Sequence, residues 1–114
     1  MWLLDVNIDL RVVDLLAALG QPAESAISQG WRELRNGHLL KKAVENNYSS
    51  LLTRDKLFHE SAKKVFEHNP NFSIVLIDLP QAKYPQYLES FKMSWNTNPI
   101  KPVSGKCIIW PGGS

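Results

Sequence analysis

The segment FSIVLIDL, residues 72–79, decides the fold of this chain. It follows the turn-forming Asn69-Pro70-Asn71, and its run from Ile74 to Ile77 is apolar without interruption. An apolar run that does not alternate with polar residues is typical of a strand buried on both faces, as in a parallel sheet that helices cover on two sides. We therefore expect residues 72–79 to form a buried parallel strand.

Outward from this strand, short apolar runs alternate with segments of helical periodicity. Further strands are expected at residues 2–6, within 23–28, at 49–53 and near 104–110. Helices are expected from a cap at Asp9 to a stop at Gly20, after an N-cap at Asn36, over 57–68 and over 84–97. On the first of these helices the apolar residues at helical spacing are Leu10, Val13, Leu16 and Ala17. This alternation predicts one α/β domain over residues 1–114, with a mostly parallel sheet of four to five strands flanked by helices and a tail at 110–114.

The composition is that of an ordinary globular domain. The chain has 114 residues, of which 44% are hydrophobic and 21% charged, so it can bury a core without metal or disulfide staples. Its single cysteine, Cys107, allows no internal disulfide and suits a reducing cytoplasm. The N-terminal MWLLDVNIDL meets charge at its fifth residue, unlike a signal peptide, and no apolar stretch approaches the roughly 20 residues that span a bilayer. We therefore expect a cytoplasmic protein that does not enter membranes.

Charge is unevenly distributed along the chain, although the formal net charge is only +2. Residues 1–31 hold one arginine against four acids, whereas residues 32–64 hold eight Lys or Arg against four acids. A basic segment of this kind indicates either a polyanion or acidic partner, or simply a solvated surface. Six cations of this segment could hold RNA phosphates around a site or form a solvated face: Arg32, Arg35, Lys41, Lys42, Arg54 and Lys56. Trp31 could stack on a base or serve only packing.

Three acids lie at or just after the carboxyl ends of predicted strands: Asp5, Asp55 and Asp78. The carboxyl ends of parallel strands meet at one edge of a sheet, where ligands of open α/β sheets bind. Converging carboxylates repel each other unless a cation lies among them, and Mg²⁺ or Mn²⁺ is the ion that such oxygens hold. Each acid has a structural alternative as a turn, capping or ion-pairing residue. No P-loop, dinucleotide fingerprint, Ser-His-Asp order or Cys/His zinc pattern occurs in the sequence.

Three motifs resemble those of the bacterial PIN-like family of small single-domain proteins. They are LLDVNID at 3–9, GWRELRNGHLL at 30–40 and LLTRDKLF at 51–58. The family patterns are LLDEN-[LIV]-P, approximately G-W-x-G-L-x-N-G-E-L-L, and L-[LV]-T-x-D. The resemblance covers residues 3 to about 60, and the remainder fits the family layout loosely.

The resemblance implies a PIN-like three-layer sandwich with an acidic pocket at the strand ends. Family members with a full pocket are metal-dependent ribonucleases, and many are toxins held by a small DNA-binding antitoxin. Matched to this sequence, the first motif supplies Asp5 and Asn7 and the third supplies Thr53 and Asp55. The middle motif supplies Asn36 and Gly37 as structural residues.

Three positions depart from the family patterns. Val6 stands where a glutamate is expected, Asp9 where a proline is expected, and His38 where an acid is expected. Two carboxylates are therefore missing from the matched positions. His38 could bind a softer ion such as Mn²⁺ or Zn²⁺ as a neutral imidazole, or could be an ordinary surface residue.

Three functional hypotheses follow from the sequence. The first is a PIN-like endoribonuclease of the toxin type, which cuts RNA with Mg²⁺ or Mn²⁺. Asp5 and Asp55 would be its catalytic ligands, with Asn7 and Thr53 orienting them; His38 and Asp78 are further metal-ligand candidates. The second is a catalytically reduced PIN-like module that binds RNA or a protein partner. The third is a structural or dimerisation subunit, in which the chain forms a homodimer.

Overall fold

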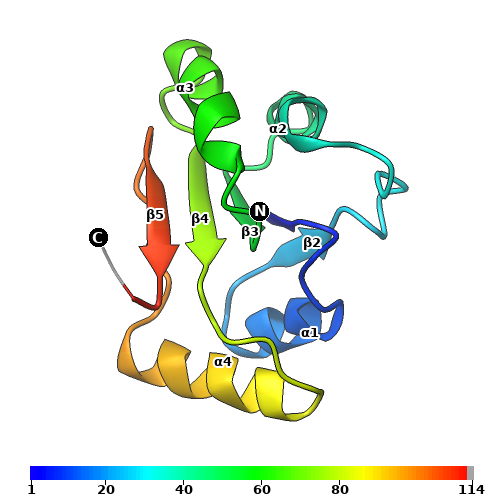
Figure 1. Cartoon of the computed structure of the whole chain (residues 1–114), viewed down its shortest axis with the longest axis vertical. Helices are drawn as coiled ribbons and strands as arrows, with labels where there is room; N and C mark the ends of the chain where they lie inside the picture. Colours follow the sequence, from blue (N-terminus) through cyan, green and yellow to red (C-terminus); the bar gives the residue numbers. More distant parts are fainter. Residues whose placement is uncertain (113–114) are drawn as a thin grey trace.

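A computed structural model describes residues 1–112, apart from the side chains of His59 and Glu60. Its centre is a five-stranded, all-parallel sheet with the strand order β2-β1-β3-β4-β5 (Figure 1). The strands are β1 (Trp2–Leu4), β2 (Ala23–Ser25), β3 (Ser50–Thr53), β4 (Ser73–Ile77) and β5 (Cys107–Trp110). The predicted α/β class, the parallel sheet and its strand number are confirmed.

Four helices complete the fold: α1 (Arg11–Ala18), α2 (Asn36–Glu45), α3 (Phe58–His68) and α4 (Gln86–Thr97). Helices α1 and α4 share one core cluster with the sheet, and α2 and α3 share another. The two pairs thus cover opposite faces of the sheet, which gives three layers (Figure 1). A parallel sheet requires such cover, because its crossover helices return on the faces.

Neighbouring residues of each strand face opposite layers. In β1, Leu4 lies in the cluster of α1 and α4, whereas Leu3 lies in the cluster of α2 and α3. In β3, Leu52 lies in the cluster of α1 and α4, and Leu51 lies in the cluster of α2 and α3. This two-residue period explains why the strand sequences are apolar throughout, since both faces are buried.

The helix caps differ in detail from the expectation. Asp9 accepts a hydrogen bond from the backbone N–H of Arg11 at 2.9 Å, as a capping residue does. Asn36 was expected as an N-cap but is the first residue of α2, after Arg35 in an extended conformation with no side-chain cap. Gly20 ends the first helical segment with a positive φ of 89°, as expected.

The buried face of α1 also differs from the expectation. The helix buries Val12 and Leu16, whereas Leu10 and Ala17 are exposed. Leu10 precedes the helix in the turn that follows Asp9, so its side chain does not follow the helical stripe. At the other end of the chain, the strand expected near 104–110 is confirmed as β5, and its last residue, Trp110, is buried and does not belong to the tail expected at 110–114. Residues 113–114 lie outside the described residues.

Candidate functional site

The carboxyl ends of β1 and β3 bring together the first and third sequence motifs. The backbone N–H of Asp5 continues the β1–β3 pairing by donating to the carbonyl of Leu52 at 2.9 Å. Asp5 therefore lies beside Thr53, the last residue of β3. The structure therefore confirms that the carboxyl ends of these two strands lie side by side.

The Asp5 carboxylate is 5% exposed and accepts hydrogen bonds at both oxygens. Its Oδ2 accepts from the Thr53 hydroxyl at 2.7 Å, and its Oδ1 accepts from the backbone N–H of Val6 at 2.7 Å. Burial raises the pKa of Asp5, these two hydrogen bonds oppose the rise, and the charge of Asp55 adds to it. Burial is the largest of these effects, so the site disfavours a charged Asp5 despite its donors.

Asp55 joins the same network through Thr53. The backbone N–H of Asp55 donates to the Thr53 hydroxyl oxygen at 3.0 Å, and Asp55 Oδ1 accepts from the N–H of Leu57 at 2.9 Å. Asn7 bridges the two loops, since its side-chain oxygen accepts from the backbone N–H of Arg54 at 3.1 Å. We call Asp5, Asn7, Thr53 and Asp55 the strand-end network; all four were predicted to lie together.

The other two predicted metal ligands do not complete this network. His38 is exposed in the first turn of α2, and Asp78 is exposed after β4. Among the described side chains, no three His, Cys, Asp or Glu residues lie close enough together to hold a metal ion jointly. Of the predicted metal ligands, only Asp5 and Asp55 belong to the strand-end network, and both oxygens of Asp5 already accept hydrogen bonds.

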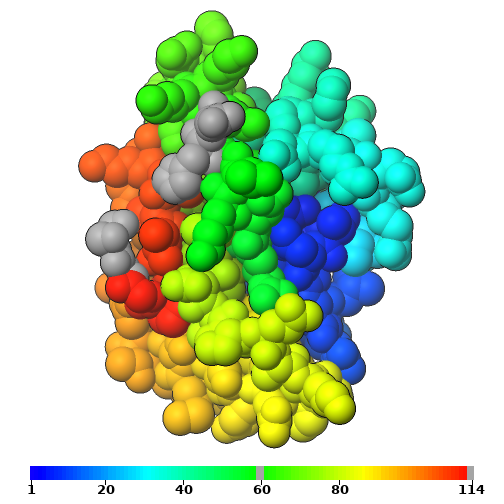
Figure 2. Space-filling model, in the orientation of Figure 1, coloured from blue at the N-terminus to red at the C-terminus, as the bar shows by residue number. Residues whose placement is uncertain are grey.

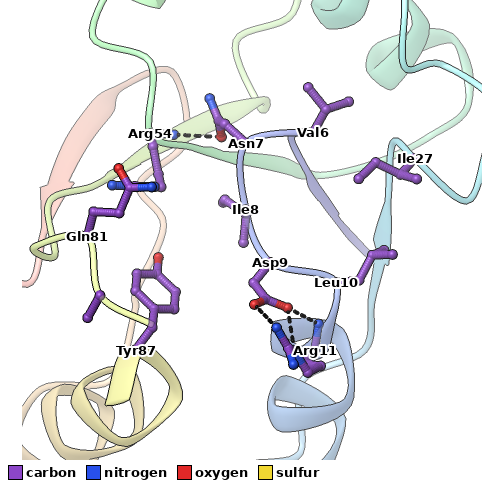
Figure 3. A pocket seen from close by; sticks show the side chains of 11 residues that line it. Val6, Asn7, Ile8, Asp9, Leu10, Arg11, Ile27, Arg54, Gln81 and Tyr87 are labelled. Atoms are coloured by element: carbon purple, nitrogen blue, oxygen red, sulfur yellow. Dashed lines mark hydrogen bonds and ion pairs between the residues drawn. The ribbon is translucent and has the colours of Figure 1, made fainter. Parts of the chain in front are cut away.

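A cleft of about 510 Å³ opens beside the strand-end network (Figure 3). Asn7 and Arg54 belong to its wall. Most of the wall comes from the β1–α1 loop, the β3–α3 loop and the segment before α4, which meet on the face shown in Figure 2 as blue, green and yellow atoms. The first turns of α1 and α4 and the β2–α2 loop add one residue each. Its residues are Val6, Asn7, Ile8, Asp9, Leu10, Arg11, Ile27, Arg54, Gln81, Ala82 and Tyr87.

Two arginines and one aspartate give the cleft wall a formal charge of +1. Arg11 pairs with Asp9 through a 2.7 Å contact from Nη2 to Oδ2, and this partner lowers the pKa of Asp9. Arg11 also lies 3.7 Å from the ring centre of Tyr84. Among the side chains that the structure describes, Arg11–Asp9 is the only ion pair, so Arg54 has no described carboxylate within ion-pair distance.

Tyr87 places a hydroxyl in the cleft wall without a hydrogen-bond partner. The residue is 5% exposed, and its hydroxyl is the one buried side-chain polar atom among the described residues that has no such partner. Figure 3 shows it pointing toward the space beside Arg54 and Gln81. Burial raises the pKa of Tyr87, so the hydroxyl stays protonated and can donate.

The remaining basic residues lie elsewhere. Lys56 is exposed on the loop that carries Arg54, whereas Arg32, Arg35 and Lys41 are exposed on α2 or the loop before it, outside the cleft wall. Trp31 is half-buried and packs edge-on against Tyr48, with ring centres 6.2 Å apart.

Sequence reasoning missed Tyr87 and Gln81 as cleft residues. Tyr87 lies on the helix expected over 84–97, where the sequence favoured either the core or a partner surface for it, and it is buried. Its missing partner depends on which loops surround the hydroxyl, and no local sequence pattern encodes that.

Comparison with family models, with curated proteins and with solved structures finds no match to this chain. Over the described residues, no helix is both long enough and apolar enough to cross a membrane.

Proposed function

We propose that this chain is a PIN-like domain, catalytically reduced, that binds RNA at the carboxyl end of its sheet. The observation that carries the proposal is the use of Asp5 as a buried hydrogen-bond acceptor for Thr53 and Val6, beside a cleft whose charge is positive. In a full acidic pocket, free carboxylates would face an ion. At the carboxyl end of this sheet, the side chain that lines the cleft is instead the cation Arg54. The direct bonds between residues of the first and third motifs support the PIN-like resemblance.

RNA binding at this edge would begin with the phosphate backbone. Arg54 lies in the cleft wall, and the exposed Lys56 follows two residues later on the same loop. Such cations supply affinity without reading sequence, and aromatic side chains can add stacking on bases.

The test measures binding of fluorescent single-stranded and structured RNA at low salt by anisotropy. Arg54→Gln should weaken binding about tenfold, as expected when a charge-assisted hydrogen bond is lost. Lys92→Gln, at an exposed position on α4, is the matched control and should bind like the wild type. Absence of RNA affinity at low salt would instead support a structural or dimerisation subunit.

One observation favours a second candidate, the metal-dependent endoribonuclease. The charge of Asp55 raises the pKa of Asp5, so the two carboxylates are near enough to repel, and a cation would relieve this repulsion. Asp5 and Asp55 would hold Mg²⁺ or Mn²⁺, which when bound activates water and stabilises the charge that develops on a phosphate. Asn7 and Thr53 would orient the two carboxylates through their hydrogen bonds.

Metal titration and cleavage assays separate the two candidates. Calorimetry with MnCl₂ should show no binding at millimolar metal if the domain is catalytically reduced. RNA cleavage that requires Mn²⁺, stops with EDTA and is lost in Asp55→Asn would support the nuclease and contradict the reduced module.

A further inference from the structure

The unpartnered hydroxyl of Tyr87 indicates a ligand in the cleft. A buried polar group without a hydrogen bond costs about 1–3 kcal/mol in a folded protein, so buried polar groups are normally satisfied. Tyr87 is 5% exposed, and the polar groups beside its hydroxyl in Figure 3 are the Arg54 guanidinium and the Gln81 amide. All three can donate, so an acceptor placed among them would satisfy each of them.

The charge of the cleft makes that acceptor an anion. Asp9 is neutralised by Arg11, which leaves Arg54 as the excess charge of the wall. The Arg54 guanidinium lies 5.8 Å from the ring centre of Tyr87, so an oxygen-rich group can reach both side chains. A phosphate has several acceptor oxygens and suits the forked donors of arginine.

The lining of the cleft also includes aliphatic side chains. Val6, Ile8, Leu10 and Ile27 are its aliphatic residues. Figure 3 shows Ile8 on the side of the β1–α1 loop that faces Tyr87, and Val6, Leu10 and Ile27 on the other side of that loop. The volume of about 510 Å³ lies within the range of roughly 300–1,000 Å³ that is usual for small-molecule sites. The cleft therefore suits a ligand with an anionic end and a flat, weakly polar body.

We propose that the cleft binds a nucleoside phosphate, with its phosphate held by Tyr87, Arg54 and Gln81 and its base against the aliphatic side chains of the lining. The nucleoside phosphate is either a free mononucleotide or the terminal nucleotide of an RNA. This inference deepens the proposed function, because it names the chemical group that the RNA-binding edge takes. The inference rests on the proposed function only where the ligand is the terminal nucleotide of an RNA, and a free mononucleotide site does not require it.

Calorimetry with AMP, UMP, adenosine and inorganic phosphate tests the site directly. AMP or UMP should bind at least about tenfold more tightly than adenosine, because the phosphate adds charge-assisted hydrogen bonds. Each should also bind more tightly than phosphate alone. Equal binding of AMP and inorganic phosphate overturns the nucleoside part of the proposal, and no binding of AMP or UMP overturns all of it.

Tyr87→Phe removes only the hydroxyl and is the decisive variant. It should weaken AMP binding about tenfold, while its melting temperature without ligand stays equal to that of the wild type or rises, because the lost hydroxyl has no protein partner. Tyr48→Phe is the matched control: its hydroxyl donates to Glu24 at 3.1 Å in the other core layer, so it should lose stability and keep AMP affinity. Unchanged AMP affinity in Tyr87→Phe would overturn the proposal.

Two oligoribonucleotides, one with a 5′-phosphate and one with a 5′-hydroxyl, distinguish the sources of the ligand. Tighter binding of the phosphorylated strand, with competition by AMP, assigns the cleft to an RNA end. AMP binding without RNA binding keeps the cleft as a mononucleotide site and rejects the proposed RNA function. RNA binding that ignores both AMP and Tyr87→Phe keeps the RNA function and rejects the cleft as a nucleotide site.

Discussion

The carboxylate of Asp5 connects two loops, although its surroundings disfavour its charged form. Thr53 and Val6 donate to it, but burial and the nearby charge of Asp55 both raise its pKa. A raised native pKa means that the folded state binds a proton that the unfolded state has already released. The contribution of Asp5 to the free energy of unfolding is therefore full below 3.8, the ordinary value, and falls as the pH rises through the native pKa.

Substitutions in the strand-end network should move the pKa of Asp5 in opposite directions. Asp55→Asn removes a repelling charge and should lower it, whereas Thr53→Val removes a stabilising donor and should raise it. Thr53→Val also removes the 2.7 Å donor of Asp5 Oδ2 and leaves that buried oxygen only the 3.4 Å hydrogen bond from the Asn7 amide. The substitution should therefore cost about 1 kcal/mol of unfolding free energy. Carbon-13 NMR of the side-chain carboxyl groups, followed over pH, measures the shifts.

Asp9 provides an internal reference in the same spectra. Its hydrogen bond from Arg11 lowers its pKa, so it should titrate below 3.8 while Asp5 titrates above 3.8. If Asp5 titrates together with Asp9, or if Asp55→Asn leaves Asp5 unchanged, the two carboxylates do not interact as described.

At the scale of helices and strands, the hydrophobic periodicity of the sequence predicted most elements, whereas it did not predict the cleft. The continuous apolar run at 74–77 predicted β4 correctly, because a short, β-branched run between turn residues is typical of a strand covered on both faces. The α1 stripe was placed partly wrongly, since Leu10 precedes the helix and is 44% exposed. Asp5 and Thr53 could be placed at one edge by topology alone, but the cleft could not. Its wall needs the path of the segment before α4, and a turn-rich segment without a repeating pattern does not predict its own path.

Two glycines with opposite roles test how the elements are connected. Gly105, before β5, has a φ of 72°, and an added Cβ would lie 3.1 Å from the carbonyl oxygen of Pro70. Gly105→Ala should therefore lower the unfolding free energy by about 1–2 kcal/mol. Gly37, in the first turn of α2, has open space around it and no positive φ, so Gly37→Ala should raise stability by about 0.5 kcal/mol. Urea denaturation measures both, and equal stability of the two variants would contradict the account of the β5 connection.

Across the whole molecule, the cleft lies where an acidic and a basic part of the chain meet. Residues 1–31, which include β1 and α1, carry one arginine against four acids, whereas residues 32–64 carry eight Lys or Arg against four acids. The basic part includes α2 and α3, which cover one face of the sheet, and β3, whose end carries Arg54 to the cleft. An RNA strand could therefore be held at the cleft alone or also across the α2 side.

The salt dependence of RNA binding distinguishes these two paths. For single strands, the slope of log affinity against log salt is about −0.7 for each phosphate contact. Contacts from Arg54 and Lys56 alone predict a slope of about −1.4, whereas adding Arg32, Arg35 and Lys41 predicts about −3.5. Because only Arg54 belongs to the cleft wall and Lys56 shares its loop, we expect the shallower slope. Arg54→Gln should reduce its magnitude by about 0.7, while Lys41→Gln should leave it unchanged. A steep slope that falls in Lys41→Gln would move the RNA path from the cleft to the α2 side.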